Sequence, residues 1–168
     1  LVTKVHLEAL KFAREGRTII LIGHQDHQEI VGTFGEAPEQ TIVVDSVEAV
    51  DRLTVPDPTR LAYLTQTTLS LYDTKEIVAR LRERFPNVVG PASDDICYAT
   101  QNRQDAVKFM APQCDVVIVV GSPNSSNSNR LREVAENMNV PAYMVDSATE
   151  LEARWITGKK RIGVTAGA

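Results

Sequence analysis

Short runs of apolar residues alternate along the chain with amphipathic stretches. The apolar runs are rich in β-branched residues, as at residues 18–22 and 116–120, which is typical of buried strands in parallel sheets. The stretches between them carry apolar residues at helical spacing. This alternation predicts an α/β fold in which helices connect parallel strands.

The predicted strands share a short apolar core bounded by polar or glycine positions: residues 18–22, 41–44, 60–64, 116–120, 142–145 and 161–164. The predicted helices share an apolar stripe beside a charged face: residues 4–14, 47–52, 73–84, 103–110, 130–137 and 149–156. Because the two sets alternate, we expect repeated strand–helix–strand units.

The two halves of the chain repeat one another. Residues 18–23 and 116–121 are both β-branched runs that end in glycine. Residues 44–46 and 145–147 both read Val-Asp-Ser and precede a predicted helix. Each half then has a further strand that runs into a threonine. We infer two similar parallel-sheet α/β units.

The boundary between these units is expected where proline and glycine interrupt the pattern, after residue 85. We therefore assign residues 1–93 to one unit and residues 94–168 to the other. The chain begins without methionine and stops directly after an apolar run. We expect both ends to be cut from a longer protein and the second unit to be truncated.

Net charge, apolar run length and cysteine number argue against several classes of protein. A net charge of −4 argues against binding to duplex nucleic acid, which needs a basic face. The apolar runs are too short for a membrane-spanning helix, so a soluble protein is expected. The two cysteines, Cys97 and Cys114, are too few for a disulfide framework and suit a reducing compartment, the cytoplasm. A compact anionic ligand remains compatible with these properties.

Polar residues follow the strands, where ligands bind in parallel α/β sheets. His24, His27 and Glu29 follow the first strand. His27 could bind an anion and Glu29 could donate a proton. A zinc site built from these three residues is a weaker alternative, because the HExxH order is absent and no further ligand is evident.

Two other strand ends carry hydroxyl groups. Thr67 lies in a threonine-rich turn, where it could relay a proton beside a carboxylate or simply cap the next helix. Ser125, Ser126 and Asn127 lie in a loop before a helix, and helix N-termini favour phosphate groups. This loop predicts a phosphate or diphosphate site, with a flexible linker as the alternative.

The spacing of the two cysteines does not by itself indicate a metal site. One thiolate cannot hold an iron–sulfur cluster, so Cys97 on its own reads as a buried structural thiol. Cys114 precedes a buried strand and reads as structural as well. The residues alone therefore predict a diphosphate-binding α/β protein.

Taken together, the polar segments closely resemble the 4-hydroxy-3-methylbut-2-enyl diphosphate reductase family of LytB type. The resemblance rests on blocks in family order that extend over essentially the whole chain: GHQDHQEIVGTFGE (residues 23–36), TQTTLS (65–70), DDICYATQNRQ (94–104), VVGSPNSSNSNRL (119–131) and GVTAGA (163–168).

The resemblance implies a site around a [4Fe-4S] cluster held by three cysteines. Cys97 would be the third of these, and the other two would precede Leu1. His27 would bind the substrate diphosphate, Glu29 would donate the proton and Thr67 would relay it. The diphosphate would be held by Ser125, Ser126 and Asn127.

The implied reaction is a reductive dehydroxylation that yields isopentenyl and dimethylallyl diphosphates in isoprenoid biosynthesis. Electrons would arrive from a ferredoxin or flavodoxin, and the cluster would carry the electron chemistry. The alternative is a diphosphate-binding remnant without a cluster, because this chain holds a single candidate ligand. The isolated chain is expected to be inactive.

Overall fold

The computed structural model describes residues 1–69, 71–91 and 97–167. The boundary expected at residue 93 lies outside these residues, as do parts of the segments 65–70, 94–104 and 163–168. The chain divides into two compact units, Leu1–Cys97 and Tyr98–Ala168. None of its described helices is long and apolar enough to span a bilayer.

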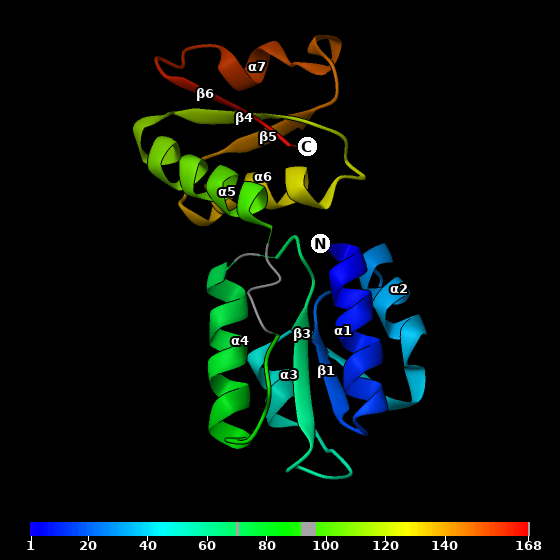
Figure 1. Ribbon diagram of the computed structural model, residues 1–168. Helices are drawn as coiled ribbons and strands as arrows, with labels where there is room; N and C mark the ends of the chain where they lie inside the picture. The colour runs from blue at the N-terminus through cyan, green and yellow to red at the C-terminus, as the bar shows by residue number, and fades with distance from the viewer. Residues whose placement is uncertain (70, 92–96, 168) are drawn as a thin grey trace. The chain divides into compact units, whose positions relative to one another are not determined.

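The first unit is a three-layer α/β sandwich, as Figure 1 shows. Its parallel strands lie in the order β2-β1-β3, with bounds Thr18–Ile22 (β1), Thr41–Val44 (β2) and Leu61–Thr65 (β3). Its helices are α1 (Val2–Arg14), α2 (Gln28–Glu36), α3 (Val47–Asp51) and α4 (Leu71–Arg84), with a 3₁₀ turn at Pro38–Gln40. The predicted α/β class with parallel strands is confirmed.

Alternate side chains of β1 supply two hydrophobic cores. Ile19 and Leu21 pack with the buried residues of α1 and with Ile30 of α2. Ile20 and Ile22 pack on the opposite face with residues of α3 and α4. Because strand side chains alternate between faces, a strand covered on both sides must be apolar throughout. This burial explains the unbroken TIILI sequence of β1.

The second unit repeats this parallel arrangement. Its strands lie in the order β5-β4-β6, with bounds Val116–Val120 (β4), Ala142–Val145 (β5) and Ile162–Ala166 (β6). Its helices are α5 (Tyr98–Met110), α6 (Ser126–Asn137) and α7 (Ala153–Ile156), with 3₁₀ turns at Ala111–Gln113 and Ala148–Glu150. Helices α5 and α6 cover the face that carries Val117 and Val119.

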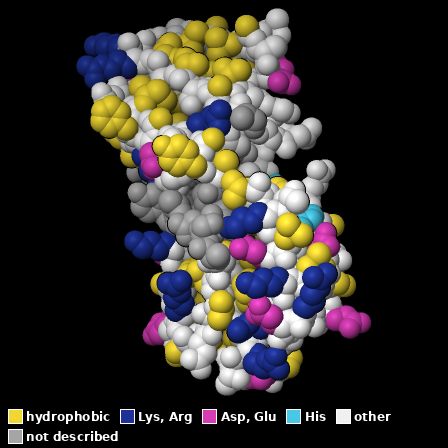
Figure 2. Space-filling view, viewed as in Figure 1, with side chains coloured by type: hydrophobic (Ala, Val, Ile, Leu, Met, Phe, Trp, Pro, Cys, Tyr) yellow, Lys and Arg dark blue, Asp and Glu magenta, His cyan; other side chains and the backbone are white. Residues whose placement is uncertain are grey.

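The other face of the second sheet is partly open. Trp155 stacks on Tyr143 there at a centroid distance of 4.4 Å. Ile162 and Val164 of β6 are 43% and 63% exposed, and hydrophobic side chains gather on the surface of this unit in Figure 2. In the first unit α4 covers the corresponding face of β3, but the described part of the second unit contains no counterpart of α4.

The hydrogen bonds at the strand ends confirm the repeat inferred from the sequence. The equivalent backbone bonds are Gly23 N–H to Val44 O and Gly121 N–H to Val145 O, both 2.9 Å, together with Gln66 N–H to Ile22 O at 2.8 Å and Gly167 N–H to Val120 O at 2.9 Å. Each unit therefore closes the carboxyl end of its sheet in the same way.

Four strands and the C-terminal ends of most helices lie where the sequence predicts them, but several helix starts do not. Helix α2 was not predicted, because Gly32 and Gly35 lower its helix propensity and its N-cap is a histidine. Helices α4 and α5 begin earlier than expected, at Leu71 and Tyr98. The helix predicted over residues 149–156 divides into a 3₁₀ turn and α7, because Leu151 and Glu152 adopt extended backbone.

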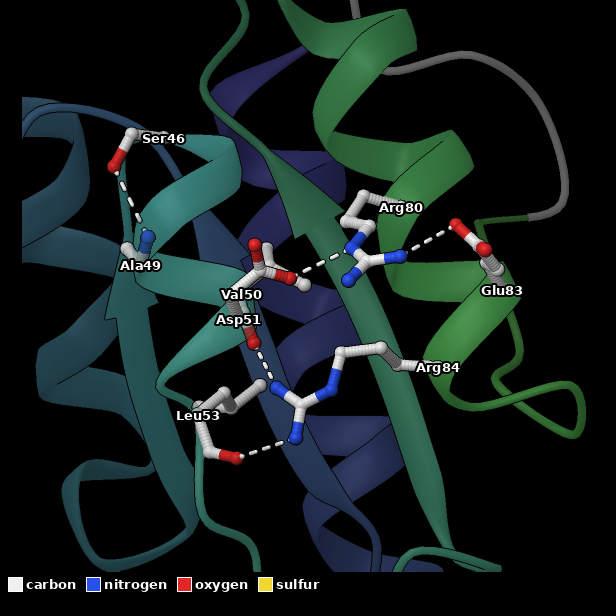
Figure 3. Close-up of polar contacts among 8 residues, drawn as sticks. All are labelled: Ser46, Ala49, Val50, Asp51, Leu53, Arg80, Glu83 and Arg84. Carbon is white, nitrogen blue, oxygen red and sulfur yellow. Dashed lines mark hydrogen bonds and ion pairs between the residues drawn. The ribbon is translucent and has the colours of Figure 1, made fainter.

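An arginine of α4 connects two helices in the first unit. Arg84 donates to the backbone carbonyls of Val50 and Leu53, where α3 ends (Figure 3), and its guanidinium lies 5.0 Å from the centre of the Phe85 ring. A cation is favourable at a helix C-terminus, because the last carbonyls lack partners within the helix. Arg84 therefore stabilises both α3 and its packing against α4.

We predict that Arg84→Ala lowers the free energy of unfolding by about 1–3 kcal/mol, since it leaves partly buried carbonyls without a charged donor. Arg80→Ala is the matched control, because Arg80 makes exposed ion pairs with Asp51 and Glu83 that solvent screens, and it should cost clearly less stability than Arg84→Ala. Urea denaturation measures both. Equal losses for the two variants would contradict the role assigned to Arg84.

An aspartate closes the amino end of the second sheet. The Asp115 carboxylate accepts the backbone N–H groups of Arg161 at 3.0 Å and Lys160 at 2.7 Å. These bonds favour the charged form and hold the pKa of Asp115 below its ordinary value. This contribution is present at neutral pH and is lost as the pH falls through the lowered pKa.

Candidate functional site

A carboxylate and a hydroxyl are hydrogen-bonded at the carboxyl end of the first sheet. Ile22 and Thr65 pair in register, so the residues that follow β1 and β3 meet there. Glu29, in the first turn of α2, is 9% exposed. Its Oε1 accepts the Thr67 N–H at 2.8 Å, and its Oε2 accepts the Thr67 hydroxyl at 3.1 Å. Both carboxylate oxygens are thereby fixed in one orientation.

His27 is the N-cap of α2. Its Nδ1 accepts the backbone N–H of Glu29 at 3.2 Å. A neutral imidazole that accepts at Nδ1 carries its proton on Nε2, so the other edge of the ring is a donor. The ring is half-buried. His27 can thus hold α2 in place and donate a hydrogen bond to an anion.

Gln66 joins the two segments that supply these groups. It is 2% exposed, its Oε1 accepts the His24 N–H at 3.1 Å, and its Nε2 donates to the Thr68 hydroxyl at 2.7 Å. A buried amide with both ends bonded is rigid, and losing it leaves groups without partners. Gln66 therefore helps to position Glu29 and Thr67, a role that the sequence analysis did not assign.

We predict that Gln66→Leu destabilises the chain by about 1–3 kcal/mol, because the His24 N–H loses its acceptor in a partly buried position. Gln25→Leu tests the same change in the same loop at an exposed position, where an effect within about 0.5 kcal/mol is expected. Thermal and urea denaturation give the comparison. A loss of stability in Gln25→Leu as large as that in Gln66→Leu would contradict the bridging role.

Cys97 lies beside the same turn. Its backbone N–H donates to the Thr67 carbonyl at 3.1 Å. Its side chain is half-buried and forms no disulfide. The first unit therefore brings together four of the residues singled out from the sequence, His27, Glu29, Thr67 and Cys97.

The donor set fits one ligand of an iron–sulfur cluster. Cys97 supplies a thiol on a residue whose backbone is bonded to Thr67, whereas a cubane takes several thiolates. Cys114, the other cysteine, precedes β4 at the amino end of its sheet and packs with Met110 in the core of the second unit. The remaining ligands of any cluster would come from outside this chain.

A zinc site does not form from His24, His27 and Glu29. Within residues 1–69, 71–91 and 97–167 no three His, Cys, Asp or Glu side chains are grouped as a metal site. His27 Nδ1 is occupied by the α2 backbone, and both oxygens of Glu29 are occupied by Thr67. Acid–base chemistry suits these groups better than metal binding.

The serine–asparagine segment of the second unit begins a helix. Ser125 is the N-cap of α6, and its hydroxyl accepts the Ser128 N–H at 3.3 Å. Ser126 and Asn127 thus lie in the first helical turn, and the prediction that the helix starts at residue 130 was wrong. Serine and asparagine have low helix propensity, so the sequence pattern does not indicate a helix start at Ser126. The first turn of a helix presents backbone N–H groups to an anion.

The N-termini of α2 and α6 are structurally equivalent. His27 and Ser125 occupy the same N-cap position, and their N–H groups donate to His24 O and Ser122 O, both at 2.9 Å. Glu29 and Asn127 then fall at the same position of each first turn. A carboxylate there repels an incoming anion, whereas an amide does not. Of the two first turns, only that of α6 is suited to bind a phosphate through its backbone N–H groups, whereas α2 offers the ring of its N-cap His27.

Two buried polar side chains lie in the first turn of α6. Asn127 is 6% exposed and Ser128 is 0% exposed. Among the described residues, Asn127 Oδ1 and Ser128 Oγ have no hydrogen-bond partner. Buried polar atoms normally have partners. Asn127 Oδ1 can only accept a hydrogen bond, so the amide NH₂ of Asn127 is the group that could donate to an anion, while Ser128 Oγ lies close to Gly121 and Gly167. The sequence analysis had not singled out Ser128.

Comparison with known proteins shows the family to which the chain is similar. The family model described as LytB protein matches residues 1–168. The 4-hydroxy-3-methylbut-2-enyl diphosphate reductase of Ralstonia nicotianae is 62% identical over the whole chain, which spans 52% of that protein. The reductase of that name from Pseudomonas entomophila is 57% identical, and the chain spans 55% of it.

A solved structure extends the comparison. The structure of the E-1-hydroxy-2-methyl-but-2-enyl-4-diphosphate reductase from Plasmodium falciparum matches with a TM-score of 0.93 and 40% identity. The match covers 99% of this chain and 52% of that one. The chain therefore spans about half the length of the relatives that it matches.

Proposed function

We propose that this chain, which belongs to the LytB protein family, is the part of a 4-hydroxy-3-methylbut-2-enyl diphosphate reductase that supplies the proton donor and a diphosphate-binding turn. The observation that carries the proposal is the Glu29 carboxylate, fixed by two hydrogen bonds to Thr67 beside Cys97. A reductive dehydroxylation needs a proton donor for the leaving hydroxyl, which Glu29 can be, and a source of electrons, for which Cys97 can supply one cluster ligand.

The reaction consumes two electrons and two protons for each substrate molecule. The allylic C–O bond breaks, the hydroxyl leaves as water and the carbon skeleton takes up the other proton. In this proposal Glu29 protonates the leaving hydroxyl, and Thr67 holds both the carboxylate and the substrate oxygen. Burial of Glu29 excludes water, which would compete for the proton.

Each unit carries its own proposed group for the diphosphate: His27 in the first unit and the first turn of α6 in the second. His27 would donate from Nε2. Ser125, Ser126 and Asn127 would offer hydroxyl, amide and backbone donors at a helix N-terminus. The chain has a net charge of −4, so local donors and not overall charge must hold the anion.

A [4Fe-4S] cluster with Cys97 as one ligand would supply the electrons. We propose that it forms only in the longer protein, because the described residues offer a single thiolate at this site. A ferredoxin or flavodoxin is the proposed electron donor, and the cytoplasm is the proposed location, where the two free thiols stay reduced.

The experiment is an anaerobic assay of a protein of the relatives' full length that contains this chain. With a cluster reconstituted and reduced viologen as donor, it should convert 4-hydroxy-3-methylbut-2-enyl diphosphate into isopentenyl and dimethylallyl diphosphates. The isolated chain, assayed identically, should give neither product. A full-length protein with its cluster intact but without products would contradict the proposal.

A further inference from the structure

We infer that Gly121, Gly167 and Ser128 form a seat that sets the position of the diphosphate-binding turn, with Ser128 as a positioning residue. Gly121 follows the central strand β4, Gly167 follows the edge strand β6, and Ser128 lies in the first turn of α6. The inference rests on the proposed function, because it concerns the turn that would hold the diphosphate.

The seat is defined by close contact. A Cβ atom on Gly121 would lie 2.1 Å from Ser128 Oγ and 2.8 Å from its Cβ. A Cβ atom on Gly167 would lie 1.8 Å from the same Oγ and 2.9 Å from Ser128 Cα. Real Cβ atoms essentially never come this close to another atom. A side chain at either glycine must therefore displace Ser128 and the start of α6.

Backbone conformation does not explain these glycines. The glycines with positive φ in the described chain are Gly16 and Gly158, and neither lies at the seat. Gly121 and Gly167 therefore have backbone angles that other residues adopt easily. Their lack of a side chain matters only because the first turn of α6 lies directly against the strand ends.

The first unit uses larger groups at two of the same three places. Gly23 corresponds to Gly121, Gln66 to Gly167 and Ile30 to Ser128. A Cβ atom on Gly23 would lie 2.4 Å from Ile30 Cδ1 and 2.9 Å from Gln66 Cβ. Two of the three side chains are thus smaller in the second unit. The smaller side chains let the N-terminus of α6 lie close to the strand ends, with its donors toward the place where ligands bind such sheets.

Ser128 is completely buried, and its Oγ has no partner among the described residues. Its side chain therefore acts by filling the space between the two glycines. Its backbone N–H is held by the N-cap hydroxyl of Ser125 at 3.3 Å. A shift of Ser128 consequently shifts Ser125 and the two residues between them, which are the proposed diphosphate ligands.

The test is the binding of inorganic pyrophosphate to the full chain by isothermal titration calorimetry. Gly121→Ala should weaken binding at least about tenfold, because a small displacement of a positioned donor set has large effects. Gly35→Ala is the matched control, since a Cβ atom there meets nothing within 4 Å, and it should bind as the unmodified chain does.

A second substitution separates positioning from loss of fold. Ser128→Gly removes both atoms that Gly121→Ala would strike, so the double variant should recover most of the pyrophosphate affinity and of the thermal midpoint. Wild-type affinity in a folded Gly121→Ala variant would overturn the inference and leave the proposed function standing. So would failure of Ser128→Gly to restore binding. No pyrophosphate binding by the unmodified chain would overturn the diphosphate site itself and the seat with it.

Discussion

Glu29→Gln should reduce the turnover number of the proposed full-length reductase at least about 100-fold, the usual scale for loss of a general acid. Glutamine is nearly isosteric with glutamate. Its carbonyl oxygen can still accept the Thr67 N–H, so the turn after β3 should keep its conformation. The amide cannot deliver a proton at neutral pH. The loss should therefore fall on kcat and leave KM within about threefold, since the removed interaction acts only in the transition state.

Glu39→Gln is the control for this experiment, because Glu39 is exposed and lies in the same unit. It should be indistinguishable from the unmodified enzyme. The thermal midpoint of Glu29→Gln should stay close to that of the parent. Undiminished turnover of Glu29→Gln with a fully loaded cluster would rule out the proton-donor role.

Cys97→Ser should remove the cluster from the full-length protein. Serine keeps the size and the hydrogen bond of the Cys97 backbone to Thr67, so the fold is expected to persist. An alkoxide ligand forms far less readily than a thiolate at neutral pH. We expect iron and acid-labile sulfide after anaerobic reconstitution to fall to less than about a fifth of the unmodified content, with activity lost in proportion.

Cys114→Ser provides the comparison, since Cys114 packs in the core of the second unit, at the amino end of its sheet. This variant should keep its iron and its activity, with a modest loss of stability. Equal iron in Cys97→Ser and the unmodified protein would contradict ligation by Cys97. Equal losses of iron in both cysteine variants would contradict it as well.

The fold was largely predictable because the central strands β1 and β4 are almost completely buried. Continuous apolar runs such as residues 18–22 and 116–120 have few alternatives, and the repeated order of elements fixed the parallel topology. Helix starts were less predictable, because they depend on caps whose residues are not strong signals. His27 caps α2 through a ring nitrogen, and histidine is not among the residues preferred at that position.

The site was predictable where chemistry follows a strand. Glu29 and Thr67 lie far apart in the chain, but parallel pairing of β1 and β3 brings them into contact. Gln66 and Ser128 were missed because their roles depend on contacts with glycines and backbone groups. The sequence does contain a signal for Ser128, because Gly23 and Gly121 correspond in the repeat. Ile30 and Ser128 follow these glycines at the same spacing and therefore correspond as well.

The two equivalent helix N-termini have different proposed roles. The first turn of α2 holds its own acid, Glu29, whereas the first turn of α6 receives an external anion. Amide chemical shifts of the chain, titrated with inorganic pyrophosphate, test this directly. Saturable shifts should appear at Ser126, Asn127 and Ser128 and exceed any at Gln28 and Glu29. Larger shifts at the α2 residues, or uniform shifts across both helices, would contradict it.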